Sequence, residues 1–368
     1  MKLTHTICPS CSVGCGINLI TQKQEAVGTY PYKRHPINEG KNCKKGRECY
    51  ELLNEEKRLL NPHIKKSNLV KSDWEESLNL AVSEMKSCEP GEIGIIGSGN
   101  CTNEECEILK KFATSLGVEN IGFPAGNFPY FDFETASLND VENSQFILII
   151  GNILKEYPLI GRKVIQAKEN GAEIITIDYL EKTNTGMISD QYIQTKSIRD
   201  FLDKQAKEIQ AKLTESSVII VGKLDHKEEL EEFQQIAAKS NSKIIPVMKE
   251  CNSRGAMKTL SPLSEEKLKA MIDKVKLLYV VEDDIVSHMG EAVKKLDFLI
   301  TQSTTLNRTA LVSDVVFPAA CWAEKTGSFT NVTGNTQNVQ QIVPPPGEAM
   351  DDAAIIMKIA EKMEIDWE

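Results

Sequence analysis

Four cysteines crowd the start of the chain, and their spacing constrains the fold more than any other feature. Cys8, Cys11, Cys15 and Cys43 follow the pattern C-x2-C-x3-C-x27-C. Thiolates at this spacing suit a [4Fe–4S] cluster, because three of them wrap one side of it and a distant fourth closes it. Structural zinc usually takes two close ligand pairs, which three cysteines plus one match poorly. We expect a cluster-organised module here, with zinc and unliganded core cysteines as the less favoured alternatives.

The remaining composition places the chain among ordinary globular proteins. Six further cysteines are scattered, and MKLTHTICPSCSVGC has no apolar segment after a basic start, which favours reduced thiols in a cytoplasmic protein. The formal net charge is −10, without a cluster of basic and aromatic residues, so we expect no nucleic-acid partner. No apolar run approaches the ~20 residues that cross a bilayer, so no membrane insertion is expected.

Helices and short apolar strands alternate from Trp74 onward. DWEESLNLAVSEMKS predicts a helix capped by Asp73, and Thr102 and Glu105 predict a capping box for the next helix, which Gly117 ends. Apolar strands such as EIGIIGSG, SQFILIIGN, AEIITID and SSVIIVG separate the helices, and a long charged helix is expected over 200–213. This alternation predicts mostly parallel sheets covered by helices on both faces, with ligand loops beyond the strand C-ends.

Three segments resemble one known family. The motif CPSCSVGC followed by HPINEGKNCKKGR is similar to the N-terminal iron–sulfur domain of molybdopterin oxidoreductases, such as formate dehydrogenase, formylmethanofuran dehydrogenase and the large iron–sulfur subunit of complex I. The segment SGNCTNEECEILKKF (98–112) and the stretch from LNRTALVSDVVFPAACWAEKTGSFTN to the C-terminus extend the similarity over nearly the whole chain.

The resemblance implies a fold and its division into domains. The fold class is α/β, with a small N-terminal [4Fe–4S] domain over 1–57 and two doubly wound, mostly parallel-sheet domains. One of these is discontinuous, over 58–124 plus 215–368, and the other is inserted over 125–214. The C-terminal β-rich domain of catalytic relatives is expected to be absent, since the sequence stops at Trp367 and Glu368.

The resemblance also implies residues that contact the pterin. Lys45, in CKKGR, matches a lysine between the cluster and the pterin. The positions that match contacts to a molybdopterin guanine dinucleotide lie at strand ends and turns: Gly151, Asn152, Asp178, Asn252, Gly255 and Thr309. Whether this chain retains that cofactor is left open.

One departure from the family concerns the catalytic metal. Catalytic relatives carry a cysteine or selenocysteine followed by a histidine after the TNEE helix, whereas residues 117–144 contain neither Cys nor His. Cys101 and Cys106 lie before this point and are interpreted as core cysteines. Oxygen ligation by Asp132 or Glu134 is the alternative, because carboxylates bind hard metals. The aromatic run that includes Phe128, Tyr130 and Phe131 suggests a plugged pocket.

These features lead to three functional hypotheses. The first is an iron–sulfur electron-transfer subunit with a degenerate molybdenum or tungsten site, in a hetero-oligomeric complex with other iron–sulfur or flavin proteins. The second is a catalytic subunit of a bis-pterin formate or formylmethanofuran dehydrogenase whose last domain is a separate chain. The third is an interaction module in which the cluster is only structural.

Overall fold

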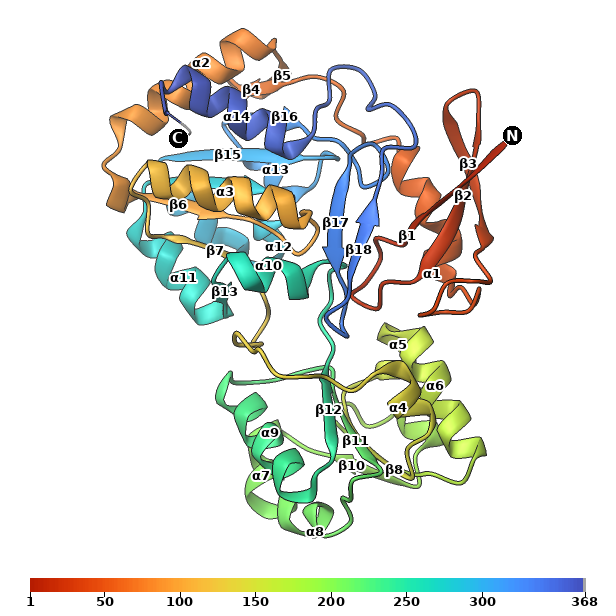
Figure 1. The fold of residues 1–368 in the computed structure, drawn as a ribbon. Coiled ribbons are helices and arrows are strands. Elements are labelled where there is room, and N and C mark those ends of the chain that lie inside the picture. The colour runs from red at the N-terminus through yellow and green to blue at the C-terminus, as the bar shows by residue number, and fades with distance from the viewer. Residues whose placement is uncertain (367–368) are drawn as a thin grey trace.

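The computed structural model describes residues 1–366, so Trp367 and Glu368 lie outside the described residues. The described chain forms a small antiparallel sheet, two larger sheets covered by helices, and a two-stranded hairpin (Figure 1). The fold is therefore α/β, as the alternating pattern predicts. None of the helices within residues 1–366 is both long enough and apolar enough to span a membrane.

The N-terminal unit is a three-stranded antiparallel sheet followed by short helices. Its strands are β1 (Lys2–Ile7), β2 (Gly16–Gln22) and β3 (Glu25–Pro31), in that order, and α1 (Lys44–Glu48) leads into a 3-10 turn over Cys49–Leu53. The loop between β1 and β2 carries three of the four motif cysteines, and Cys43 stands directly before α1. The sheet and α1 therefore bring the two parts of the motif together.

The eight-stranded sheet forms the body of the molecule. Its order is β13 (Pro262–Leu263), β7 (Ile121–Pro124), β6 (Ile93–Ile96), β14 (Leu277–Val281), β15 (Phe298–Ser303), β16 (Val315–Pro318), β4 (His63–Lys65) and β5 (Leu69–Lys71). The first six strands are parallel, and β4 and β5 form an antiparallel edge.

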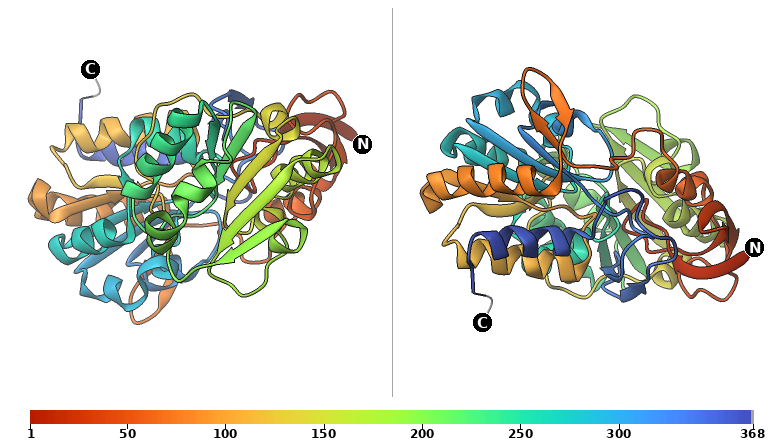
Figure 2. Two further views of the ribbon diagram at one scale, coloured as in Figure 1. Left: turned by 90° about the horizontal axis from the view of Figure 1, so that it is seen from below. Right: turned by 90° about the horizontal axis from the view of Figure 1, so that it is seen from above.

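Helices cover both faces of the eight-stranded sheet (Figure 2). One face carries α2 (Trp74–Ser87), α3 (Asn103–Ser115) and α14 (Asp352–Lys362), and the other carries α11 (Glu265–Lys274), α12 (Ile285–Met289) and α13 (Arg308–Val312). The strands β6, β14 and β16 consist mainly of apolar residues because both of their faces are buried.

The five-stranded sheet is entirely parallel and doubly wound. Its order is β10 (Gln191–Gln194), β9 (Glu173–Asp178), β8 (Phe146–Ile150), β11 (Ser217–Val221) and β12 (Lys243–Pro246). One face packs against α4 (Leu138–Glu142), α5 (Ile153–Glu156) and α6 (Pro158–Glu169), and the other against α7 (Ile198–Lys204), α8 (Ala206–Gln210) and α9 (Glu228–Ser240). The strand order reverses between β8 and β11, which is where such sheets bind ligands.

Two expectations need correction. Strands β11 and β12 lie within 215–368, which the sequence assigned to the first α/β domain, but β11 pairs with β8 and extends the other sheet to Pro246. The boundary at residue 214 therefore cuts through a sheet. The helix expected over 200–213 is broken at Gln205, and each half buries its own apolar side chain, Phe201 or Ile209.

The predicted helix starts agree with the structure. The Asp73 carboxylate accepts the Glu76 N–H at 2.8 Å, and Thr102 and Glu105 form the reciprocal capping box at the start of α3. Gly117 follows α3 with a φ of +69°. Near the C-terminal end, β17 (Gly327–Thr330) and β18 (Thr336–Val339) form the two-stranded hairpin. Between the sheets lies α10 (Ser253–Thr259).

Candidate iron–sulfur and cofactor site

The four motif cysteines line one cavity. Cys8, Cys11 and Cys15 are buried and Cys43 is half-buried, and all four contribute to the wall of the same small cavity. Pro158 and Leu159, at the start of α6, form part of its other side. The Cys8 N–H donates to the Cys15 carbonyl at 2.8 Å and closes the β1–β2 loop on itself. The four cysteines that the spacing predicts as cluster ligands therefore lie together in the structure.

The hairpin β17–β18 packs against the cysteine loop. Gly14 has a φ of +74°, and a Cβ at this position would collide with Gln337 and with Asn331. The Ser12 carbonyl accepts the Val332 N–H at 2.7 Å, and the Ser12 hydroxyl donates to the Met248 carbonyl at 2.5 Å. The loop is therefore anchored both to the hairpin and to the segment that follows β12.

The pKa values of the cysteine thiols suit a bound cationic metal centre. Burial raises the pKa of Cys11 to about 12 and also raises the pKa of Cys15, so these two thiols keep their protons without a nearby cation. A hydrogen bond from Cys49 lowers the pKa of Cys8 to about 7. A coordinated metal ion removes the proton of a thiol, so bound iron would hold Cys11 and Cys15 as thiolates despite their burial. Soft thiolates in a small apolar cavity therefore fit an iron–sulfur cluster.

The other candidate metal-ligating residues, Asp132, Glu134, Cys101 and Cys106, do not line this cavity. No group of three or more His, Cys, Asp or Glu side chains in residues 1–366 is placed to hold one metal ion. The four cysteines instead surround a shared cavity. In the segment that lacks the catalytic cysteine, Asp132 and Glu134 are both outside the buried core. Cys101 and Cys106 are fully buried in the core, in agreement with the interpretation from the sequence.

Lys45 bridges two parts of the molecule. Its side chain is exposed, and its Nζ donates to the Glu156 carbonyl at the end of α5, at 3.2 Å. Its positive charge lies near enough to the cysteine loop to lower the pKa of Cys8 and Cys11, although burial and hydrogen bonding have larger effects there. Lys45 therefore lies between the cysteine loop and the five-stranded sheet.

Three of the predicted pterin contacts gather at the C-terminal edge of the five-stranded sheet. Gly151 follows β8 with a φ of +103°, next to the reversal in strand order. The Asn152 Oδ1 accepts from the Thr185 N–H and hydroxyl, at 3.3 and 3.0 Å. The Asp178 carboxylate ends β9 and accepts the Tyr179 N–H at 2.7 Å. These residues share one edge, where a bound nucleotide is expected.

The other three predicted contacts lie outside the five-stranded sheet, at α10 and in α13. Asn252 is fully buried, donates to the Cys101 carbonyl at 2.8 Å and accepts the Thr330 N–H at 2.6 Å, so it joins the turn before α3 to the hairpin. A Cβ at Gly255 would collide with Asn103 and Asn252. Thr309 lies apart from these two, where its hydroxyl donates to Asp284 at 2.8 Å. The predicted contacts therefore lie in three places: the C-terminal edge of the five-stranded sheet, α10 and α13.

A cavity that the sequence did not reveal lies between the cysteine loop and the eight-stranded sheet. It encloses about 230 Å³ and touches Pro9 of the cysteine motif, Cys251, and residues that follow β6, β14 and β15. Two buried polar atoms on its lining residues, Glu282 Oε1 and Trp322 Nε1, have no hydrogen-bond partner within residues 1–366. Glu282 also has a φ of +57°, a strained backbone for a residue with a side chain, and such strain concentrates at functional sites.

A buried lysine stands beside this cavity. Lys325 lines it, and its Nζ lies 2.8 Å from Glu105 and 2.9 Å from Asp352. Burial and nearby carboxylates raise the pKa of Glu282 well above its ordinary range. Two sequence features could have pointed to these residues. Glu282 directly follows an apolar strand, in VVEDD, and Lys325 lies two residues before a glycine, in AEKTG.

Comparisons with known proteins agree with this arrangement. The model of the molybdopterin oxidoreductase family matches residues 58–362, and that of the molybdopterin oxidoreductase Fe4S4 domain matches residues 1–55. The chain belongs to the molybdopterin oxidoreductase family. These two matches support a [4Fe–4S] cluster and a molybdopterin as its cofactors. The second match also places the cysteine motif in an iron–sulfur domain, which favours the cluster over zinc.

The relatives include several formate dehydrogenases. The chain is 31% identical to the F420-dependent formate dehydrogenase subunit alpha of Methanocaldococcus jannaschii, over 98% of this chain and 70% of that protein. It is 29% identical to subunit alpha of F420-dependent formate dehydrogenase 2 of Methanococcus maripaludis, with the same coverage. The first alignment extends over 475 residues, although this chain has 368, so the relative contains segments that this chain lacks.

A solved structure has the same fold. Acetylene hydratase from Pelobacter acetylenicus superposes with a TM-score of 0.69 at 15% identity, over 98% of this chain and 69% of that one. At this identity the likeness concerns the fold alone. It confirms the α/β architecture with an N-terminal iron–sulfur domain.

Proposed function

We propose that this formate dehydrogenase-like protein is an iron–sulfur electron-transfer subunit of a larger redox complex. Cys8, Cys11, Cys15 and Cys43 would be the four ligands of its cluster. The observation that carries the proposal is that these cysteines, from two distant segments, line one buried cavity, whereas residues 117–144 contain no Cys or His to hold a catalytic metal. A bound cluster would supply reversible one-electron transfer.

The neighbouring residues would tune and protect such a cluster. Pro158 and Leu159 close the cavity with apolar surface, which keeps water away from the ligands. The positive charge of Lys45 favours the extra negative charge that the cluster gains on reduction. Cys43 is the least buried of the four ligands and gives the shortest protein path to solvent.

The chain also has residues that would hold a pterin dinucleotide. Gly151, followed by Asn152, has no side chain at the strand-order reversal, where a pyrophosphate can approach the backbone. Beside the eight-stranded sheet, the unpartnered Trp322 N–H and Glu282 carboxyl offer a donor and an acceptor to a polar group. This supports retention of the pterin as a bound group, with Asp178, Asn252, Gly255 and Thr309 as further contacts.

In residues 117–144, which lack the metal-ligand cysteine, aromatic side chains pack into the core of the protein. Phe131 is buried and stacks on the guanidinium of Arg254, with 3.9 Å between the Arg254 Cζ and the ring centroid. Phe128 is buried in the same core, whereas Tyr130 is exposed. The aromatic run therefore supports a degenerate molybdenum or tungsten site.

The second candidate is a catalytic subunit. It is favoured by the similarity to subunits alpha of F420-dependent formate dehydrogenases, and it would act on formate or a formyl group. The names of those relatives also support partner subunits in a hetero-oligomeric complex, with iron–sulfur or flavin proteins as the proposed kinds.

Metal and cofactor analysis of the anaerobically purified complex tests both candidates. We expect about four iron atoms per chain, a cluster that is reversibly reduced in a redox titration followed by electron paramagnetic resonance, and no stoichiometric molybdenum or tungsten. Stoichiometric molybdenum or tungsten with turnover of formate would establish the catalytic alternative. Bound iron that cannot be reversibly reduced would support a cluster with only a structural role.

Replacement of one proposed ligand tests the site itself. We expect Cys11→Ser to lose most of the iron and the order of residues 1–55, because ligand binding and folding are coupled in a small metal-organised domain. Cys88→Ser is the matched control, since Cys88 is a half-buried thiol outside the cavity. Iron content equal to that of the unmodified protein in Cys11→Ser would contradict the assignment.

A further inference from the structure

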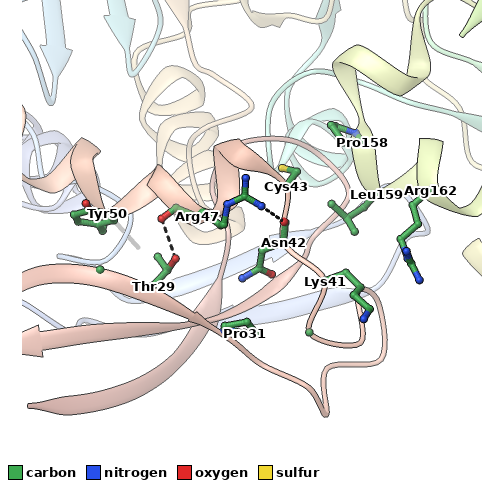
Figure 3. A pocket seen from close by; sticks show the side chains of 12 residues that line it. Thr29, Pro31, Lys41, Asn42, Cys43, Arg47, Tyr50, Pro158, Leu159 and Arg162 are labelled. Atoms are coloured by element: carbon green, nitrogen blue, oxygen red, sulfur yellow. Dashed lines mark hydrogen bonds between the residues drawn. The ribbon is translucent and has the colours of Figure 1, made fainter. Parts of the chain in front are cut away.

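An open cleft lies on the outer side of the cysteine cavity. It encloses about 660 Å³ between β3, the loop before Cys43, α1 and the start of α6. Figure 3 shows Cys43 with its neighbour Asn42 on one side and Leu159 and Arg162 of α6 on the other. Cys43 lines both this cleft and the cysteine cavity, so the cleft leads from solvent to the least buried of the four cysteines.

The charged lining of the cleft is entirely basic. Its charged residues are Lys41, Arg47 and Arg162, and it contains no carboxylate among the residues that line it. Arg47 donates to the Asn42 carbonyl at 3.0 Å, whereas Lys41 and Arg162 have no side-chain hydrogen bond or ion pair within residues 1–366. Both of these side chains are exposed, so their charges are free to meet a partner.

This basic cleft contrasts with the rest of the molecule. Residues 1–55 contain eight Lys and Arg and five Glu, whereas the whole chain contains 43 basic and 53 acidic residues. A positive end on an otherwise acidic protein orients an acidic partner toward that end and repels it elsewhere. Val27 and Tyr30, on the strand β3 that forms one wall, are exposed apolar residues that add contact surface.

We propose that this cleft docks an acidic electron-transfer protein, whose carboxylates meet Lys41, Arg47 and Arg162 beside Cys43. The inference rests on the proposed function and specifies where its electrons leave. One electron passes from the reduced cluster of this chain to the oxidised centre of the partner, and no covalent bond or proton is exchanged. A small, electrostatically steered contact is typical of transient electron-transfer complexes.

Charge reversal in the cleft tests the inference. The probe is an acidic two-cluster bacterial ferredoxin, mixed anaerobically with the reduced full-length chain in a stopped-flow instrument. Arg162→Glu and Lys41→Glu should each slow electron transfer about tenfold at low ionic strength, with a smaller difference at high salt because the charges are screened. Lys239→Glu, an exposed reversal on α9, is the matched control and should change the rate little.

A second readout separates this inference from the proposed function. Each variant is also reduced by a zwitterionic viologen, which reports on the cluster without a charged partner. Unchanged viologen rates with slowed ferredoxin rates support docking in the cleft. Unchanged ferredoxin rates in both cleft variants, with an intact cluster signal, would overturn the docking site and leave the electron-transfer function standing. A wild-type chain without a reducible cluster would overturn both.

Discussion

At the scale of the residue, Lys325 is the side chain whose loss we expect to cost most. Its side chain is 2% exposed and lies between Glu105 and Asp352. Burial alone would lower the pKa of Lys325, but these two carboxylates raise it. Lys325→Met leaves two buried carboxylates without their cation, so we expect a loss of about 3–5 kcal/mol in the free energy of unfolding. Urea denaturation measures this.

The control for Lys325→Met is a triple variant that also carries Glu105→Gln and Asp352→Asn. Because it removes the uncompensated charges together with the lysine, it should recover part of the lost stability. A loss below about 1 kcal/mol in the single variant would show that the three groups do not act as a buried ion network.

His35 gives the iron–sulfur domain a dependence on pH. Burial lowers the pKa of His35, and its Nδ1 accepts the Gly16 N–H at 3.1 Å, so the ring is neutral in the folded chain. As the pH falls below about 6.5, His35 takes up a proton in the unfolded chain but stays neutral in the folded chain, so the free energy of unfolding decreases. Denaturant midpoints between about pH 7.5 and about pH 5.5 should therefore fall less in His35→Gln than in the unmodified protein. Equal falls would contradict this assignment.

At the scale of the element, local signals predicted helix starts well and sheet membership poorly. The caps at Asp73 and Thr102 depend on atoms within three residues, so their sequence signature is complete. Membership of β11 in the five-stranded sheet depends on its pairing with β8, about seventy residues earlier, and no pattern inside β11 records that choice. The helix break at Gln205 likewise has no neighbouring glycine or proline that would predict it.

The contact between the cysteine loop and the hairpin is also an element-scale feature. A Cβ at Gly14 would meet Gln337 and Asn331, so Gly14→Ala should push β17–β18 away from the loop. We expect lower iron content and a loss of about 1–3 kcal/mol in stability, from overpacking and from the left-handed backbone. Iron analysis and denaturation measure the two effects.

Gly334→Ala separates these two causes. Gly334 lies at the hairpin tip with a φ of +82°, and a Cβ there would meet nothing within 4 Å. This variant therefore carries the backbone strain without the collision and should keep its iron. If Gly334→Ala loses as much iron as Gly14→Ala, the collision with the hairpin is not the cause.

At the scale of the whole molecule, two sheets point their C-terminal edges toward one small domain. Strand alternation and the resemblance together predicted this architecture and the cysteine cavity. The cavity with Glu282 and Trp322 was missed because its lining comes from Pro9, from the ends of three strands and from the loop after β16. These segments meet only in the folded chain, and an unpartnered donor or acceptor has no signature in a sequence.

The same arrangement predicts how the molecule responds when its cluster is removed. The buried residues of 1–55 include Cys8, Cys11 and Cys15 and share one core with the hairpin and with one face of the five-stranded sheet, and a unit with so few buried residues of its own depends on a bound metal for its order. The hairpin loses its contacts at Ser12 and Gly14 when the cysteine loop moves, whereas each large sheet keeps a buried face that does not share a core with that loop. Chelation of the iron should therefore increase amide hydrogen exchange in 1–55 and in 327–339, and leave β8, β11, β14 and β15 protected.

Mass spectrometry of the exchanged peptides measures this response, with Cys11→Ser as an independent way to remove the cluster. Agreement between the chelated protein and the variant would show that the change comes from the cluster and not from the chelator. Exchange that rises equally in all three sheets would mean that the cluster holds the whole fold together, because a single cooperative unit opens everywhere at once. Exchange that rises nowhere would mean that the antiparallel sheet and α1 are stable without their metal, and the cysteine cavity would then be a preformed site.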